Sequence, residues 1–271
     1  MRRYWAAWED YGDLSHPENW NRLVEDLVTA SWFDEAGLDA EAFRAQARAE
    51  PATYAALLQL LFRQYAEDAK VRVVGEKTPN HVLHMPRLQA MVPEARFIHV
   101  VRDPRAVVNS WRSVPWSSGR LWRDAEVWRD YVQAARQDAD QLEGALHTLY
   151  YEQLVRAPEA VLRAVCRFLE MPYRDKMLAF HEEAPDTVNV EREPWKEAAT
   201  RPIDPAAADR WQQELSARMV ALIEAKAWPE MERWGYLRET PWERLAPAFL
   251  SATIRKAGWK MQLLLDRMRE E

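Results

Sequence analysis

The chain has 271 residues, of which 48% are hydrophobic and 30% charged, and its formal net charge is −6. This length allows one large domain or two small ones, and no apolar run reaches the roughly 18 residues that a membrane-spanning helix needs. The negative charge argues against a nucleic-acid partner but leaves room for a local basic pocket that binds a small anion. The single cysteine, Cys166, excludes an intrachain disulfide and a thiolate metal site, and it is compatible with a cytoplasmic location.

Glycine and tryptophan are used unusually. The seven glycines never come close enough together to form a GxxxxGK[ST] or GxGxxG loop, so neither phosphate-binding signature is complete in this sequence. The fourteen tryptophans mostly stand at helical spacing among apolar residues, which favours a packing role over a stacking surface for a ligand.

The first seventy residues have a helical pattern. One helix is predicted from Pro17 through Val28 and another from Pro51 through Tyr65, each opened by a proline and continued by apolar residues three and four apart. We therefore expect residues 1–70 to form a helical cap region.

Three strand-like runs follow, each succeeded by a helix start: residues 71–74, 97–101 and 147–151. Thr78-Pro79 and Asp103-Pro104 have the form of an N-cap and a first helical residue, and Pro158 opens a helix after the third run. This alternation predicts an α/β fold with a parallel sheet, helices on both faces, and a ligand site at the carboxyl ends of the strands.

The remaining helices complete the predicted domain, which extends over residues 1–240. A long amphipathic helix is expected from Leu121 to Leu142, and another capped helix after Asp204-Pro205 continues through Ile223. Residues 241–271 are predicted to form a basic amphipathic extension that packs on the domain. Self-association or docking on a partner or a membrane surface is the alternative for this extension.

The segment from Phe97 to Ser113 is the strongest candidate for an anion site. The strand delivers Arg102 to the sheet edge, Asp103-Pro104 starts a helix whose positive end faces the same crevice, and Ser110 lies two turns further on. Arginine can grip a phosphate with several donors, and a serine hydroxyl can add another. From the residues alone, the alternative is that Arg102 pairs with a nearby carboxylate.

This segment, with Gly75-Glu76-Lys77-Thr78-Pro79 before it and Tyr150-Tyr151-Glu152-Gln153-Leu154-Val155 after it, closely resembles the sulfotransferases that use 3′-phosphoadenosine 5′-phosphosulfate. The resemblance is closest to tyrosylprotein sulfotransferase-like and related bacterial members. It implies a three-layer fold like that of P-loop nucleotide kinases. It also implies that Arg102 and Ser110 bind the 3′-phosphate and that Tyr151 helps to hold the nucleotide, although a tyrosine facing the core is the alternative for Tyr151.

The resemblance assigns further cations to the site. Lys77 matches a lysine that donates to the transferring sulfuryl group, which agrees with a loose transition state stabilised by positive charge. A solvated surface lysine is the less favoured alternative. Lys196 and Arg201 fall where the family places a mobile basic segment that closes over the nucleotide, and a solvated basic loop is their equally weighted alternative.

The predicted site also needs a general base for the acceptor hydroxyl. Glu76 is the nearest carboxylate to Lys77 and is a weak candidate, because strand alternation would turn it away from the site. His81 and His84 share a helical face without a third ligand, so we expect capping or packing there and no metal site. His99 is expected to be a core histidine with satisfied hydrogen bonds.

The resemblance also implies a strand, a glycine-rich loop like RSGTT and a helix ahead of these motifs, on the order of 25 residues that the sequence before Glu76 does not contain. Truncation and natural loss are both open explanations, and without this loop catalysis is expected to be weak. The leading hypothesis is sulfuryl transfer from 3′-phosphoadenosine 5′-phosphosulfate to a tyrosine, sugar or small-molecule hydroxyl, without a metal. The alternative is an inactive nucleotide-binding or scaffold protein.

Overall fold

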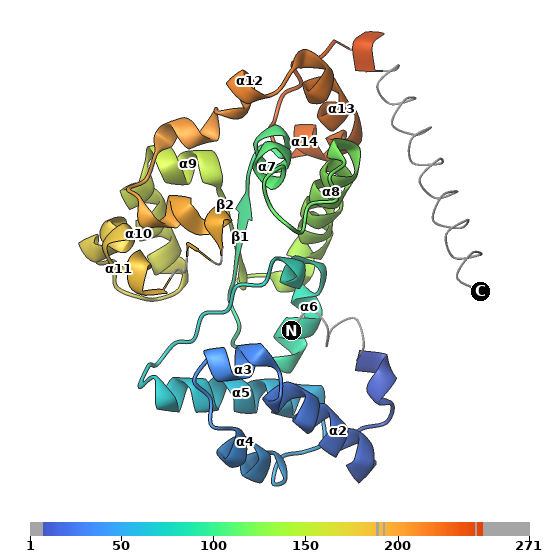
Figure 1. The fold of residues 1–271 in the computed structure, drawn as a ribbon, viewed down its shortest axis with the longest axis vertical. Coiled ribbons are helices and arrows are strands. Elements are labelled where there is room, and N and C mark those ends of the chain that lie inside the picture. Colours follow the sequence, from blue (N-terminus) through green and yellow to red (C-terminus); the bar gives the residue numbers. More distant parts are fainter. Residues whose placement is uncertain (1–7, 188–189, 192, 242, 246–271) are drawn as a thin grey trace, which may run out of the picture. The chain divides into compact units, whose positions relative to one another are not determined.

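The structure is a computed structural model that describes residues 8–187, 190–191, 193–241 and 243–245 (Figure 1). The chain forms two compact units. The first contains the residues up to Arg96 together with Asp140–Ala145, and the second contains Phe97–Ala139 and the residues from Leu146 onward. None of the described helices is both long enough and apolar enough to cross a bilayer.

The first unit is helical. Its α2 begins at Pro17, as predicted, whereas α5 begins at Tyr54 and not at Pro51, because the Thr53 hydroxyl accepts a hydrogen bond from the Ala56 N–H at 3.1 Å and caps the helix. The helices of this unit are η1 (Trp8–Tyr11), α2 (Pro17–Val28), α3 (Ser31–Glu35), α4 (Ala40–Ala47), α5 (Tyr54–Asp68), η2 (Pro79–Leu83) and α6 (Met85–Met91), and most of η3 (Ala139–Leu142) also belongs to it.

The core of the first unit is an apolar cluster between α2, α3, α4 and α5. Phe33 and Phe43 are fully buried and meet edge to face with their ring centroids 5.3 Å apart. Leu23 from α2 and Leu60 from α5 are buried to the same extent and complete the centre of the cluster.

The strand predicted for residues 71–74 is wrong. These residues are not part of a sheet, Arg72 lies in a bend, and Val71 and Val73 are 42% and 58% exposed. A β-branched run becomes a strand only where a neighbour satisfies its backbone hydrogen bonds, and among the described residues the sheet has only the two strands of the second unit.

The second unit contains that sheet. The strands β1 (Phe97–Val101) and β2 (Leu146–Tyr150) pair in parallel, with Phe97 opposite Leu146 and Val101 opposite Tyr150. The parallel pairing is therefore confirmed, and the second strand starts and ends one residue earlier than predicted. The helices are α7 (Pro104–Trp111), α8 (Leu121–Asp138), α9 (Tyr151–Arg156), α10 (Pro158–Phe168), η4 (Asp175–Ala179), α11 (Phe180–Thr187), η5 (Pro194–Thr200), η6 (Pro205–Ala208), α12 (Trp211–Glu214), α13 (Ala217–Ala227) and α14 (Glu230–Arg233).

Helices pack on both faces of the sheet in this unit, although Ile98 and Val100 of β1 stay 41% and 50% exposed on one of them. On one face, Val101 packs with Trp128 of α8 and Met231 of α14. On the other face, His147 stacks on Phe168 of α10 with ring centroids 5.2 Å apart. This α/β/α layering confirms the predicted fold class and leaves the carboxyl ends of β1 and β2 side by side.

Two helix predictions need comment. The long helix from Leu121 is confirmed as α8, whose apolar positions are buried along one side, but it ends at Asp138, and the last predicted turn is the 3-10 helix η3. The single helix expected from Pro205 to Ile223 is instead three segments, because the backbone is extended at Leu215 and the Ser216 hydroxyl then caps α13. The predicted extension over residues 241–271 lies almost wholly outside the described residues.

Candidate functional site

The register of the sheet brings two sequence motifs together. Because Val101 lies opposite Tyr150 in a parallel pair, the residues that follow them also meet: Arg102 beside Tyr151, and Asp103 beside Glu152. The sites predicted from two segments 49 residues apart therefore converge at the carboxyl ends of β1 and β2.

Arg102 is held from several sides. Its guanidinium carbon lies 4.2 Å from the centroid of the Tyr151 ring, and its Nη2 donates to the carbonyl oxygen of Ala207 at 2.7 Å. Its backbone carbonyl accepts a hydrogen bond from the indole Nε1 of Trp128 at 2.9 Å. The buried Nε of Arg102 has no hydrogen-bond partner among the described residues.

The predicted alternative for Arg102 was an ion pair with a carboxylate. In the part of the chain that the structure describes, the arginine instead donates to a backbone carbonyl and stacks on a phenol ring. Both contacts leave its positive charge without a formal counter-charge. A guanidinium with this charge and with unused donors fits a phosphate, so the residues present suit the predicted anion.

The N-terminus of α7 is occupied by carboxylates of the protein itself. Asp103 caps the helix by accepting the N–H of Arg105 at 2.8 Å, and the N–H of Asp103 donates to Glu152 Oε1 at 2.9 Å. These two acidic groups satisfy the positive end of the helix, which we had expected to face the anion directly. An anion at this edge therefore depends on Arg102 more than on the helix terminus.

Glu152 also binds Tyr236, a residue that the sequence motifs did not identify. The Tyr236 hydroxyl donates to Glu152 Oε2 at 3.0 Å. Burial, together with the negative charge of Glu152, raises the pKa of Tyr236 above its usual value. The phenol therefore stays protonated and remains a hydrogen-bond donor.

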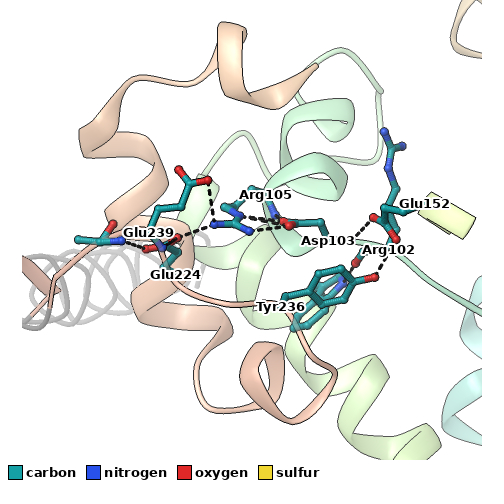
Figure 2. A network of polar contacts seen from close by, with 9 residues as sticks. Arg102, Asp103, Arg105, Glu152, Glu224, Tyr236 and Glu239 are labelled. Carbon is teal, nitrogen blue, oxygen red and sulfur yellow. Dashed lines mark hydrogen bonds and ion pairs between the residues drawn. The ribbon is translucent and has the colours of Figure 1, made fainter. Parts of the chain in front are cut away.

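Arg105 forms a second, fully interior network (Figure 2). It donates from Nη2 to Asp103 Oδ2 at 2.7 Å and from Nη1 to Glu224 Oε1 at 2.8 Å, and its guanidinium carbon lies 4.1 Å from a ring centroid of Trp211. Glu224 also accepts the backbone N–H groups of Glu239 and Thr240, each at 2.9 Å. Burial lowers the pKa of Arg105, but Asp103 and Glu224 outweigh that effect and raise it overall.

The other predicted nucleotide ligands, Ser110, Lys196 and Arg201, belong to the second unit, as Arg102 does. Ser110 is exposed in the last turn of α7. Lys196 donates to Glu193 at 2.5 Å, and Arg201 forms a close ion pair with Glu197. Neither cation contacts Arg102 or Ser110 among the described residues, so the assignment of these ligands stays a prediction.

The predicted catalytic pair lies in the first unit. Lys77 is exposed, whereas Glu76 is bonded on both oxygens: His81 Nδ1 lies 2.8 Å from Oε2, and the Thr78 hydroxyl donates to Oε1 at 2.5 Å. Thr78 stands at the N-cap position of η2, as predicted, but its side chain binds Glu76 and does not cap the helix. Burial would raise the pKa of Glu76, but the hydrogen bonds from His81 and Thr78 lower it overall.

The histidines differ from expectation. His81 is not merely a packing residue, because it is oriented by Glu76. His99 is not satisfied: its buried Nδ1 has no partner among the described residues, its ring lies edge-on to Trp234 at 5.5 Å, and burial lowers its pKa to about 4. Over the described part of the chain, no group of three histidine, cysteine or acidic residues is arranged to hold a metal ion.

Comparison with known sequences gives a consistent result. A sequence model described as the sulfotransferase family matches residues 3–175, more than half of the chain. Protein-tyrosine sulfotransferase A of Caenorhabditis elegans is 31% identical over 158 residues, which cover 55% of this chain and 41% of the relative. Protein-tyrosine sulfotransferase 1 of Danio rerio is 29% identical over 175 residues, covering 63% and 46%. The chain thus spans less than half the length of these curated relatives.

Two solved structures share the fold. The sulfotransferase domain of the Synechococcus PCC 7002 olefin synthase superimposes with a TM-score of 0.56 at 22% identity, covering 89% of this chain and 81% of that domain. The sulfotransferase domain from the curacin biosynthetic pathway gives a TM-score of 0.53 at 20% identity, with coverages of 76% and 77%. At these identities the likeness establishes the fold alone.

Proposed function

The chain belongs to the sulfotransferase family, and on that basis we propose that it transfers a sulfuryl group from 3′-phosphoadenosine 5′-phosphosulfate to a hydroxyl group. The observation that carries this proposal is the meeting of Arg102 and Tyr151 at the carboxyl ends of two parallel strands. When bound, the donor supplies the sulfuryl group and leaves as adenosine 3′,5′-bisphosphate.

We assign the 3′-phosphate to Arg102, with Ser110 as a second donor and Tyr151 as a flat surface beside the arginine. The support is electrostatic, because Arg102 carries an uncompensated charge and a buried Nε without a partner in the described structure. Lys196 and Arg201 are further proposed nucleotide ligands. Each would exchange its present partner, Glu193 or Glu197, for a phosphate oxygen.

We assign the proton-accepting role to His81 and an orienting role to Glu76. The carboxylate of Glu76 has a lowered pKa, which makes it a poor proton acceptor near neutral pH. His81 donates its Nδ1–H to Glu76 Oε2, and this bond fixes the tautomer in which Nε2 accepts the proton of the acceptor hydroxyl. Lys77 supplies positive charge for the negative charge that builds up during transfer.

We propose a tyrosine hydroxyl as the acceptor. The support comes from the relatives, several of which are protein-tyrosine sulfotransferases. A phenol has a pKa near 10, much lower than that of an aliphatic alcohol, so its proton is the easier of the two for a side-chain base to remove.

Two measurements on the purified chain test the proposal. Calorimetry should detect binding of adenosine 3′,5′-bisphosphate that Arg102→Ala weakens by about 2 to 4 kcal/mol. Labelled sulfate from the donor should appear on a tyrosine-containing peptide and not on the same peptide with phenylalanine in place of tyrosine.

The outcomes separate the parts of the proposal. Unchanged affinity in Arg102→Ala would refute the phosphate site. Binding without transfer to any acceptor would support the inactive nucleotide-binding alternative. Transfer that has the same pH profile in the wild type and in His81→Asn would remove the assigned base.

A further inference from the structure

We propose that Glu152 is a positioning residue, an inference that rests on the proposed nucleotide site. It holds the backbones of Arg102 and Tyr151 at a fixed separation at the carboxyl ends of β1 and β2, so that the two side chains stack. Glu152 would not contact the ligand itself. It would fix the backbones from which the two ligand-facing side chains extend.

The first argument is the way in which the Glu152 carboxylate is used. One oxygen accepts the backbone N–H of Asp103 at 2.9 Å, and the other accepts the hydroxyl of Tyr236 at 3.0 Å (Figure 2). These donors are 49 and 84 residues away in sequence. A single side chain thus joins the start of α7, the start of α9 and the segment after α14.

The second argument is adjacency. Arg102 immediately precedes Asp103, and Tyr151 immediately precedes Glu152. Because the Asp103–Glu152 bond fixes the separation of the two backbones, it also fixes the separation of the side chains one residue earlier. The result is the 4.2 Å stacking distance between the Arg102 guanidinium and the Tyr151 ring.

The third argument is that the contacts form a closed circuit. Tyr236 packs edge-on to Trp128 at 6.5 Å, and Trp128 donates its indole N–H to the carbonyl oxygen of Arg102. The chain of contacts therefore leaves the Arg102–Asp103 peptide through Glu152 and returns to it through Trp128. Such a circuit restrains both the carbonyl and the N–H of the peptide that follows Arg102.

The fourth argument concerns charge. A carboxylate near an anion site would weaken binding if it neutralised Arg102. Both oxygens of Glu152 instead accept hydrogen bonds from Asp103 and Tyr236, so the arginine keeps its charge for a ligand. Positioning without neutralisation is the property that distinguishes Glu152 from an ordinary ion-pair partner.

The test compares two nucleotides that differ in the 3′-phosphate. Calorimetry measures the affinities for adenosine 3′,5′-bisphosphate and for adenosine 5′-monophosphate in the wild type, Glu152→Ala and Glu152→Gln. The alanine variant should bind the bisphosphate about 10- to 100-fold more weakly while its monophosphate affinity changes little. Glutamine keeps an acceptor for the Asp103 N–H and should restore most of the loss.

Glu159→Ala is the matched control, because Glu159 is a surface glutamate of α10 that bonds Arg163 at 2.9 Å. This variant should bind both nucleotides as the wild type does. Thermal unfolding of every variant reports loss of structure separately from loss of phosphate discrimination.

A ligand-free measurement makes the inference independent of the proposed function. The ¹⁵N heteronuclear NOE of the Arg102 Nε–H should fall in Glu152→Ala and recover in Glu152→Gln. If the wild type does not prefer the bisphosphate, the proposed phosphate site fails, while this NOE still decides whether Glu152 orders Arg102. Equal NOE values and equal nucleotide preference in Glu152→Ala and the wild type would overturn the inference.

Discussion

The first unit packs around apolar side chains, whereas the second has charged groups in its interior. Phe33, Phe43 and Leu60 form the centre of the first, and its pair between Arg44 and Glu25 lies at the surface. All the buried charged residues in the described ranges belong to the second unit: Asp103, Arg105, Asp124, Glu126, Glu224, Lys226 and Glu230.

This difference follows from what each kind of interaction can specify. Apolar contacts are non-directional, so they stabilise a helical cluster without fixing any atom to a few tenths of an ångström. Hydrogen-bonded ions are directional, and they are costly to bury unless each partner is present. The second unit uses this property where the ends of β1 and α7 must be held for the proposed nucleotide.

Removing the buried guanidinium of Arg105 should cause the largest loss of stability. Arg105→Ala leaves the buried carboxylates of Asp103 and Glu224 without their partner, and we expect the second unit to be destabilised by about 3 to 5 kcal/mol. Urea denaturation measures the loss of unfolding free energy. Hydrogen exchange of peptides from each unit shows which of the two units has lost stability.

Arg44→Ala is the control for this prediction, since it breaks the surface pair of the first unit. Its effect on unfolding should be small. An equally small effect of Arg105→Ala would show that the comparison between the two interiors is mistaken.

Acidification should lower the stability of the two units over different pH ranges. His99 has a pKa of about 4 when folded and 6.5 when unfolded, so the unfolded state binds the extra proton between these values. The second unit should lose about 3 kcal/mol as the pH falls from 6.5 to 4. The contribution of Glu76 to the first unit, whose folded pKa is lowered, is complete above 4.5 and is lost as the pH falls below that value.

His99→Phe should flatten the pH dependence of the second unit, measured as the urea midpoint against pH. His16→Phe, which replaces an exposed histidine of the first unit, should leave the profile unchanged. If the urea midpoint of His99→Phe still falls with pH as in the wild type, the pH dependence comes from another group.

The smallest effect is expected for a conservative change in the apolar core. Leu60→Met keeps nearly the same volume and should cost less than about 1.5 kcal/mol in urea denaturation. Glu224→Gln is the counterpart in the second unit. It should cost more, because Arg105 loses a charged partner while the volume stays the same. The reverse order would contradict the proposed contrast.

Local signals predicted much of the fold. Asp103-Pro104 and Pro17 begin helices as expected because a cap and a proline act within a few residues. The strand at residues 97–101 and the long helix from Leu121 follow from periodicity in the same way. The two failures have different causes. Residues 71–74 have strand composition without a strand partner, which only distant residues can supply. Ser216 starts a new helix through a local cap that the apparently continuous apolar pattern concealed.

The sequence by itself determined the helix starts at Pro17, Pro104 and Leu121, the parallel α/β class, the motifs that resemble sulfotransferases and the family to which the chain belongs. Only the tertiary structure decided which side chains meet: Arg102 with Tyr151, Glu76 with His81, and Glu152 with both Asp103 and Tyr236. The physical reason is range. Caps and periodicity depend on neighbours along the chain, whereas most of these contacts depend on strand register and helix packing between segments 49 to 84 residues apart.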